Sequence, residues 1–240
     1  MEKQKKTWNE LAKVFSECKS THPDQDLADL ELDYILLHVN GKTLNVGCGI
    51  GYETLACREI TGDAEGLDFS EEMVRISRER FPSCKFIVGD VLKLPYPDSH
   101  FDTVTTRRTL INLLKREEQK QAINEIKRVT KNRGRVILVE ATEKGYAILN
   151  NYRRLFGLDE IKVVEFNLPL DESMLLQEFP NSEISTLDTY YFLTRIYYPL
   201  VSEKVEYGTA FQKFAKELQR KINISIRCSP HVLLTVAIRK

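Results

Sequence analysis

Short apolar runs alternate with segments of helical periodicity over the first 140 residues. The runs predict strands at residues 43–46, 64–67, 85–88, 101–105 and 135–139. Apolar residues at helical spacing predict helices at residues 30–38, 53–60, 71–80 and 117–129. Strands separated by helices indicate a parallel sheet wound with right-handed crossovers. Ligands of such sheets bind at the carboxyl ends of the strands.

The pattern changes after residue 140. Helical spacing continues at residues 146–156, 172–179 and 202–221, and strands are predicted around residues 187–193 and 231–238. We interpret the last two strands as an antiparallel pair that completes the sheet. The expected fold is therefore α/β, with a doubly wound, mostly parallel seven-stranded sheet, an antiparallel C-terminal strand, and helical additions in the C-terminal part.

Composition narrows the class of protein. The 240 residues are 42% hydrophobic and 29% charged, which suits a single domain, and no repeat or Gly/Ser linker divides them. Lys+Arg and Asp+Glu both number 35, so no global charge favours nucleic acid or an anionic membrane. Five cysteines without a C-x-x-C pair disfavour zinc and disulfides. With a polar N-terminal segment and no long apolar run, we expect a cytoplasmic protein.

The strongest local motif is a strand that runs into three glycines at alternate positions, Gly47, Gly49 and Gly51. Glycine permits a tight turn and lets a ligand approach the backbone. Alone, the motif is as often structural as functional. Its G-x-G-x-G spacing, with Tyr52 following, differs from the G-x-G-x-x-G of dinucleotide-binding proteins, which argues against NAD.

Aspartates end the next two predicted strands, at Asp68 and Asp90. A carboxylate at the first place can accept both ribose hydroxyls, and one at the second can accept an adenine amino group. Each has a structural alternative, since Asp68 could cap the helix near Glu71 and Asp90 could start a turn. With the glycines, these features at three consecutive strand ends describe an adenosine site. Phe69 and Met73 could flank the adenosine, although apolar helix residues more often face the core.

Together these segments resemble the class I S-adenosylmethionine-dependent methyltransferases, in the broad group that includes the ubiquinone and menaquinone methyltransferases. The supporting segments occur in order at residues 44–51, 66–70, 89–95, 98–104 and 125–131, followed by Gly134. Two positions depart from the family. Asn45 replaces the usual acidic residue, and Asn132-Arg133-Gly134 replaces a Pro-Gly-Gly turn. Because Asn45 still accepts hydrogen bonds, we expect altered affinity and not loss of function.

The resemblance implies S-adenosyl-L-methionine as cofactor and in-line transfer of its methyl group to a nucleophile. Our leading hypothesis for that nucleophile is an oxygen or nitrogen of a small-molecule acceptor, and we expect no metal. It divides residues 1–240 into N-terminal lid helices (1–40), a cofactor-binding core (41–140) and acceptor-side helices with the last two strands (141–240). Trp8 either belongs to the lid or is an ordinary packing residue. The implied cofactor-binding residues are Gly47, Cys48, Gly49, Gly51, Asp68, Phe69, Met73, Asp90, Val91 and Arg107.

The acceptor side is less defined, and no catalytic base stands out. Arg108 could bind a carboxylate or phosphate of the acceptor, or pair with a surface carboxylate. His231 could be a base, although a lone histidine near the start of a strand is more often structural. Four tyrosines could line the acceptor pocket, although strand alternation also explains them. They are Tyr190, Tyr191, Tyr197 and Tyr198.

Three other functions stay open. A tRNA or protein methyltransferase needs a basic or grooved surface, and Lys115-Arg116, Lys127-Arg128, Lys131 and Arg133–Arg135 could supply one. Acidic neighbours at 117, 118 and 125 make these residues look like a solvated helix face, so nucleic acid is disfavoured. A non-catalytic adenosyl-ligand-binding regulatory subunit is the second alternative, and a dinucleotide oxidoreductase is the least supported. A small molecule is favoured because residues 141–240 offer helices to cap a pocket but no recognisable recognition module.

Overall fold

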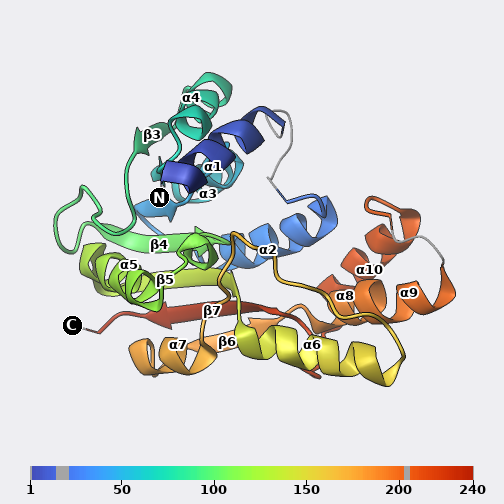
Figure 1. Ribbon diagram of the computed structural model, residues 1–240. Helices are drawn as coiled ribbons and strands as arrows, with labels where there is room; N and C mark the ends of the chain where they lie inside the picture. The colour runs from blue at the N-terminus through green and yellow to red at the C-terminus, as the bar shows by residue number, and fades with distance from the viewer. Residues whose placement is uncertain (1, 15–21, 203–205, 240) are drawn as a thin grey trace.

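The computed structural model describes residues 2–14, 22–202 and 206–239, with side chains from residue 7 onward. Within these ranges, seven strands form one sheet in the order β3-β2-β1-β4-β5-β7-β6, and helices cover both faces (Figure 1). The strands are β1 Thr43–Val46, β2 Ala64–Asp68, β3 Lys85–Val88, β4 Phe101–Arg107, β5 Thr130–Ala141, β6 Glu183–Thr186 and β7 His231–Ala237.

The helices follow the predicted alternation through the first five strands. They are α1 Glu2–Val14, α2 Gln25–His38, α3 Tyr52–Thr61, α4 Glu71–Arg80, α5 Arg116–Val129, α6 Glu143–Leu155, α7 Glu172–Glu178, α8 Asp188–Tyr191, α9 Tyr198–Val201 and α10 Ala210–Lys221. Two shorter segments are η1 Leu110–Asn112 and the π-helical η2 Phe192–Tyr197.

The direction of β7 decides which end of this strand lies at the carboxyl edge of the parallel strands. Strands β1 to β5 run parallel, whereas β7 pairs antiparallel with both β5 and β6. The register places His231, the first residue of β7, opposite Ala141, the last of β5. The start of β7 therefore lies at the carboxyl edge of the parallel strands. The mixed seven-stranded sheet confirms the predicted fold class.

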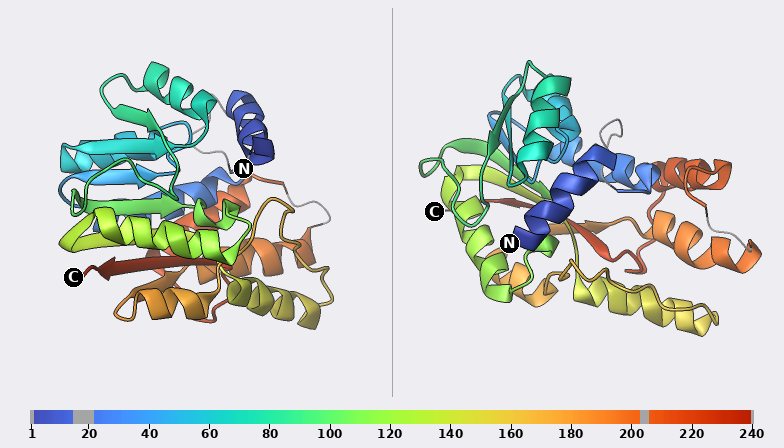
Figure 2. Two further views of the ribbon diagram at one scale, coloured as in Figure 1. Left: turned by 60° about the vertical axis from the view of Figure 1, so that its left-hand side comes forward. Right: turned by 45° about the horizontal axis from the view of Figure 1, so that its top comes forward.

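Side-chain alternation along β5 builds a core on each face of the sheet. Val136 and Leu138 join a buried cluster with residues of α5, while Ile137 and Val139 join another with residues of α2. Successive side chains of a strand point to opposite faces, so one apolar run serves both layers. Figure 2 shows α5, in light green, and α2, in light blue, on opposite sides of the sheet.

The predicted strand at residues 187–193 is wrong, because this segment forms α8 and the start of η2. Strand β6 lies just before it. Buried Asp188 accepts hydrogen bonds from the main-chain N–H groups of Ile226, Arg227 and Ser229 at 3.1, 2.8 and 2.9 Å. These contacts, together with burial of Tyr190, outweigh the strand preference of alternating aromatic residues.

The predicted helix at residues 202–221 begins later than expected. Thr209 caps α10: its side chain accepts from the main-chain N–H of Gln212, and the Gln212 side chain accepts from the main-chain N–H of Thr209. This capping box fixes the first helical residue at Ala210. Residues 203–205 of the predicted helix, and residues 15–21 of the predicted lid, lie outside the described residues.

Residues 143–169 leave the sheet after β5 and return to nearly the same point. Thr142 forms a parallel bridge with Leu170. The N–H of Leu170 donates to the Ala141 carbonyl at 2.8 Å, and the N–H of Glu143 donates to the Leu170 carbonyl at 3.0 Å. We call residues 143–169 the excursion. It contains α6 and supplies part of the cavity wall described below.

Two further properties concern the described residues alone. No helix among them has the length and apolar character needed to cross a membrane. Cys48, Cys57, Cys84 and Cys228 are buried free thiols, and Cys18 lies outside the described ranges.

Candidate active site

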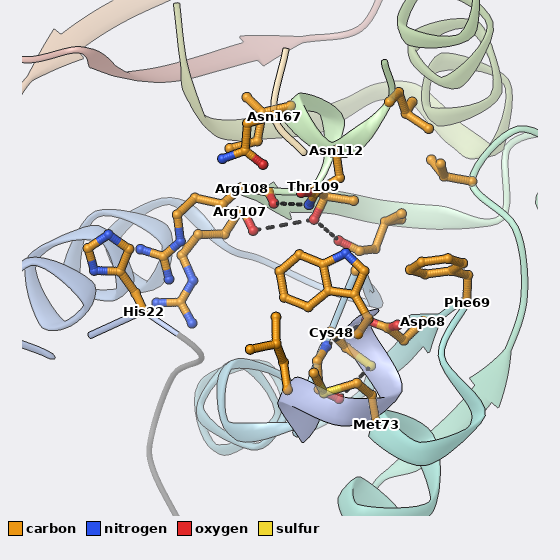
Figure 3. A pocket seen from close by; sticks show the side chains of 18 of the residues that line it. His22, Cys48, Asp68, Phe69, Met73, Arg107, Arg108, Thr109, Asn112 and Asn167 are labelled. Carbon is orange, nitrogen blue, oxygen red and sulfur yellow. Dashed lines mark hydrogen bonds between the residues drawn. The ribbon is translucent and has the colours of Figure 1, made fainter. Parts of the chain in front are cut away.

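A cavity of about 470 Å³ lies at the carboxyl edge of β1, β2 and β4. Its walls come from the loops after these strands, from α1, from the segment before α2, from the excursion, and from the start of β7. The volume falls in the range typical of small-molecule sites. Figure 3 shows Asp68, Phe69 and Met73 on one side of the cavity and His22, Arg107 and Arg108 on the other.

The glycine turn after β1 forms part of the wall. Gly47 has a φ of +71°, and a Cβ there would stand 2.1 Å from Thr109 Oγ1, so a side chain cannot fit. Gly49 also lines the cavity. Gly51 does not line it: this residue precedes α3 with a φ of +85°, and a Cβ would approach the Phe86 ring to 2.8 Å. Gly51 therefore lets the helix pack closely, whereas Gly47 and Gly49 face the ligand space.

Asp68 ends β2 with its carboxylate held at the cavity wall. Its Oδ2 accepts from the N–H of Gly49 and its Oδ1 from the N–H of Ser70, both at 2.9 Å. Burial raises the pKa of the Asp68 carboxyl, and these N–H groups oppose that shift. The alternative role of Asp68 as the cap of the following helix is wrong, because the cap of α4 is Ser70, whose Oγ accepts from the N–H of Met73 at 3.2 Å.

Asp90 closes a turn and also faces the cavity. Its Oδ1 accepts from the N–H of Leu92 at 2.9 Å, which closes a turn after β3, and the residue also lines the cavity. Cys48, Phe69 and Val91 line the cavity as well. Met73 lines it while packing in a buried cluster with Ile50 and Ala12.

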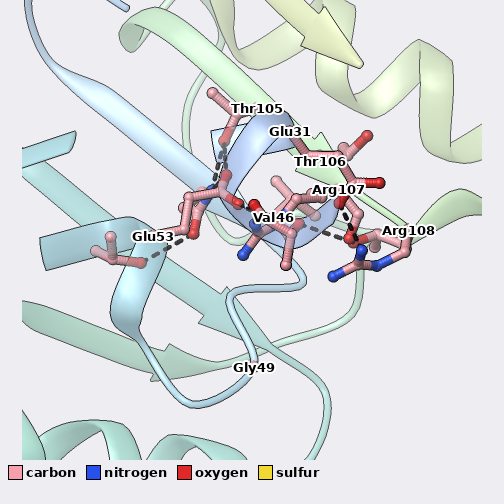
Figure 4. A network of polar contacts seen from close by, with 12 residues as sticks. Glu31, Val46, Gly49, Glu53, Thr105, Thr106, Arg107 and Arg108 are labelled. Carbon is pink, nitrogen blue, oxygen red and sulfur yellow. Dashed lines mark hydrogen bonds and ion pairs between the residues drawn. The ribbon is translucent and has the colours of Figure 1, made fainter. Parts of the chain in front are cut away.

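A buried polar network supports Arg107 and explains how Asn45 is accommodated (Figure 4). Arg107 Nε lies 2.8 Å from Glu53 Oε2, and Thr105 Oγ1 donates to Glu53 Oε1 at 3.0 Å. The Asn45 amide also donates to Glu53, and its Oδ1 accepts from Thr54 Oγ1 at 3.0 Å. Glu53 thus supplies a carboxylate beside the position where the family has one. In the sequence, this carboxylate is indicated by an acidic residue in the first helical turn after the glycines.

Arg108 faces the cavity and pairs with a buried carboxylate. It adopts a φ of +52°, and its guanidinium contacts Glu31 on α2. Burial lowers the pKa of Arg108, and Glu31 opposes this. Glu31 has no solvent exposure and also contacts His231, with 2.6 Å between Oε1 and Nδ1. Sequence reasoning did not identify Glu31, because its partners lie 77 and 200 positions away.

The four tyrosines considered for the acceptor wall do not line this cavity. Tyr190 is buried and donates to Asp24 Oδ1 at 2.7 Å, and Tyr191 packs edge-on against His231. Tyr197 and Tyr198 stack on Phe211. Their place is taken by residues of the excursion that the sequence did not single out: Tyr146, Lys162, Val164, Phe166 and Asn167.

Trp8 lies on α1 and lines the cavity. Its ring meets Phe166 edge-on, with 6.3 Å between ring centroids, and packs against the cluster of Ile50 and Met73. The helix itself packs against α4 (Figure 2). Trp8 thereby joins the N-terminal helix to both the glycine turn and the excursion.

Comparison with known sequences identifies the central part of the chain. Residues 44–138 match the family described as methyltransferase domain. Demethylmenaquinone methyltransferase of Lysinibacillus sphaericus is 30% identical over 131 residues, covering 52% of this chain and 53% of the relative. The Staphylococcus aureus protein of the same name is 32% identical over 121 residues, covering 48% and 49%. The chain spans about half the length of these curated relatives.

Solved structures share the fold at low sequence identity. A chain in the complex of the Haloferax volcanii Trm112 methyltransferase activator with a methyltransferase has a TM-score of 0.63 and 16% identity, covering 98% of this chain and 96% of that one. YcgJ of Bacillus subtilis has a TM-score of 0.54 and 17% identity, covering 89% and 99%. Residues 44–138 therefore match a methyltransferase domain, and the chain shares the fold of these solved structures.

Proposed function

We propose that the protein transfers the methyl group of S-adenosylmethionine to an oxygen or nitrogen of a small-molecule acceptor. The observation that carries this proposal is that a single cavity joins the predicted adenosyl-binding residues to a second wall built from other parts of the chain. Its volume of about 470 Å³ suits small ligands and excludes a folded macromolecule from the interior.

The residues present fit the adenosyl cofactor. The Asp68 carboxylate, fixed by two N–H groups, suits the ribose hydroxyls, and Asp90 suits the adenine amino group. Apart from Gly49 and its two chain neighbours, no atom of the described residues lies within 4 Å of the place where a Cβ of Gly49 would stand, which leaves room beside the turn. The bound cofactor supplies an electrophilic methyl group on a sulfonium. The chain's own task is to hold the acceptor in line with that group and to exclude water.

The second wall suits an apolar acceptor that carries a hydroxyl or amino group. Tyr146, Val164 and Phe166 provide apolar surface. Asn167 also lines the cavity, and a side-chain amide can both donate and accept hydrogen bonds.

Several of the basic residues weighed for nucleic-acid binding are engaged in ion pairs. Lys115 contacts Glu118 at 2.9 Å, Lys127 contacts Glu178 at 2.7 Å, and Lys131 contacts Asp102 at 2.9 Å. Arg128 pairs with Glu125 and Asp98. This arrangement is typical of a solvated helix face and supports the small-molecule proposal over a tRNA substrate.

The test has two stages. Calorimetric titration with S-adenosylmethionine, S-adenosylhomocysteine and NAD is expected to show binding of the two sulfur nucleotides only. The loaded protein is then supplied with phenols, hydroquinones and aromatic amines, and methylated products are detected by mass spectrometry. Preference for NAD, or no binding, contradicts the proposal. Cofactor binding without turnover of any acceptor favours the regulatory-subunit alternative instead.

A further inference from the structure

His231 is placed at the acceptor wall by the reversed direction of β7. Because this strand is antiparallel to β5, its first residue lies beside Ala141, at the edge where the parallel strands end. His231 is largely buried yet lines the cavity. A histidine at the start of a parallel strand would lie at the opposite edge, away from the ligand.

Glu31 fixes the tautomer of the neutral His231 ring. Burial alone would raise the pKa of the Glu31 carboxyl, but the Arg108 charge and the hydrogen bond with His231 lower it to about 2. Glu31 is therefore ionised and can only accept hydrogen bonds. Since its Oε1 lies 2.6 Å from His231 Nδ1, the ring proton of neutral His231 belongs on Nδ1. The lone pair of the neutral ring is then on Nε2.

The other ring nitrogen is left for a ligand. Within residues 2–14, 22–202 and 206–239, no side chain or main-chain group forms a hydrogen bond with His231 Nε2. Tyr191 holds the ring edge-on, with centroids 5.8 Å apart and planes at 72°. Arg108 anchors the far oxygen of Glu31. A purely structural buried histidine would be expected to satisfy both nitrogens.

The second imidazole of the cavity is a poorer base. His22 lines the cavity, and its Nδ1 lies 3.1 Å from the main-chain nitrogen of Asp24. Burial, followed by the Arg108 charge, lowers the pKa of His22 to about 3. A ring with so low a pKa has little tendency to take a proton from a hydroxyl or amino group.

We propose that His231 is the general base for the acceptor and that Glu31 is its positioning residue. This inference rests on the proposed function. His231 Nε2 takes the proton of the acceptor O–H or N–H, and the freed electron pair of that atom forms the bond to the methyl carbon. The carbon–sulfur bond breaks with its pair remaining on sulfur, and the imidazolium then returns the proton to solvent. The arrangement resembles other catalytic histidines whose second nitrogen donates to a carboxylate.

The first test needs no acceptor. Long-range ¹H–¹⁵N spectra of histidine-labelled protein saturated with S-adenosylhomocysteine are recorded between pH 7 and 9, and the His231 signals are assigned with His231→Gln. The expected result is a neutral ring protonated on Nδ1, with Nε2 unprotonated. A ring protonated on Nε2, or on both nitrogens throughout this range, overturns the proposal. Loss of S-adenosylhomocysteine binding in the unaltered protein would instead contradict the proposed function.

The second test uses the phenols that turn over in the acceptor screen. General-base catalysis typically contributes 10²–10⁴-fold, so His231→Gln should lower kcat by at least about 100-fold on a weakly acidic phenol. The loss should shrink towards a few-fold on a nitro-substituted phenol, which is already ionised and needs no base. S-adenosylhomocysteine affinity should change less than about twofold.

Matched variants separate a catalytic role from a structural one. Glu31→Gln keeps the shape but removes the charge, and its loss of kcat should likewise depend on the acidity of the phenol. His100→Gln changes a histidine at the amino end of β4, remote from the cavity, and should leave kcat unchanged. An equal loss for His231→Gln on both phenols, or no loss on either, overturns the assignment of His231 as base.

Discussion

The cavity has an adenosyl half, which contains the predicted cofactor-binding residues, and an acceptor half, which contains Arg108 and His231. The two halves are held together by different kinds of contact. In the adenosyl half, Asp68 accepts from N–H groups 2 and 19 positions away, and its neighbours follow consecutive strands. In the acceptor half, Glu31 joins Arg108 and His231 across 77 and 200 positions. The first half depends on local turns and main-chain groups, whereas the second depends on buried charges brought together only by the complete fold. We therefore expect substitutions in the acceptor half to act mainly on stability and substitutions in the adenosyl half to act mainly on ligand binding.

The largest expected effect on stability is in the acceptor half. Arg108→Met leaves the Glu31 carboxylate buried without its ionic partner, which typically costs about 3–5 kcal/mol. Urea unfolding should show this loss. The double variant Arg108→Met/Glu31→Met should recover part of it, because no uncompensated charge remains. Arg154→Met, at an exposed arginine, is the control. If Arg108→Met lowers the free energy of unfolding by less than about 1 kcal/mol, the Arg108–Glu31 pair does not stabilise this wall of the cavity.

In the adenosyl half, the main effect should fall on binding. Asp68→Ala removes the carboxylate expected to hold the ribose, so S-adenosylhomocysteine affinity should drop about 100-fold, or roughly 2.7 kcal/mol. Calorimetry measures this. Asp63→Ala changes an exposed aspartate just before β2 and should bind as the unaltered protein does. Equal affinities for the two variants would exclude Asp68 from the cofactor site.

The stability of the acceptor half should also depend on pH. The pKa of His22 is about 3 in the folded protein and near 6.5 in the unfolded chain, so the unfolded chain takes up the proton first as pH falls. The His22 contribution to stability is present above pH 6.5 and is lost progressively below it, by about 1 kcal/mol per pH unit.

Urea unfolding at pH 7, 6 and 5 tests this dependence with His22→Asn. The variant should lose stability less steeply than the unaltered protein over this range. His38→Asn, at the end of α2, serves as the control for removing an imidazole elsewhere. Parallel curves for the unaltered protein and His22→Asn would contradict the expected proton linkage.

The smallest expected effect concerns the contact between the two halves. Trp8 touches both the glycine-turn side, through Ile50 and Met73, and Phe166 of the excursion. Trp8→Ala should weaken S-adenosylhomocysteine binding by about fivefold, or roughly 1 kcal/mol, through lost apolar contact. Because Trp8 is the only tryptophan, its fluorescence should also change on ligand binding. Phe214→Ala, at an exposed ring on α10, is the matched control. Unchanged affinity and emission would make Trp8 a packing residue alone.

The strands and the strand-end aspartates around the glycine turn could be placed from the sequence because their signals are local. The strands predicted at residues 43–46 and 85–88 match β1 and β3, and Asp68 and Asp90 lie at the cavity as expected. Each signal depends on a few adjacent residues: an apolar run, a glycine that allows a positive φ, and a carboxylate at a strand end. Such signals can be recognised in the sequence without knowledge of distant contacts.

The acceptor half could not be predicted in the same way. Glu31 looks like an ordinary polar residue of a helix, and its burial becomes evident only when α2 packs beside Arg108 and β7. The tyrosines at 190 and 191 misled the strand prediction because tertiary hydrogen bonds to Asp188 and Asp24 stabilise a helix instead. In both cases, the deciding interaction joins residues far apart in the chain.

The closed geometry of the excursion has a consequence for its tolerance of sequence changes. Because residues 143–169 start and finish against Ala141 and Leu170, their length and composition can change while the sheet keeps its pairing. The entropic cost of lengthening such a loop grows only slowly with its length. We therefore expect the excursion to tolerate insertions and replacements that leave the sheet and the glycine turn unchanged.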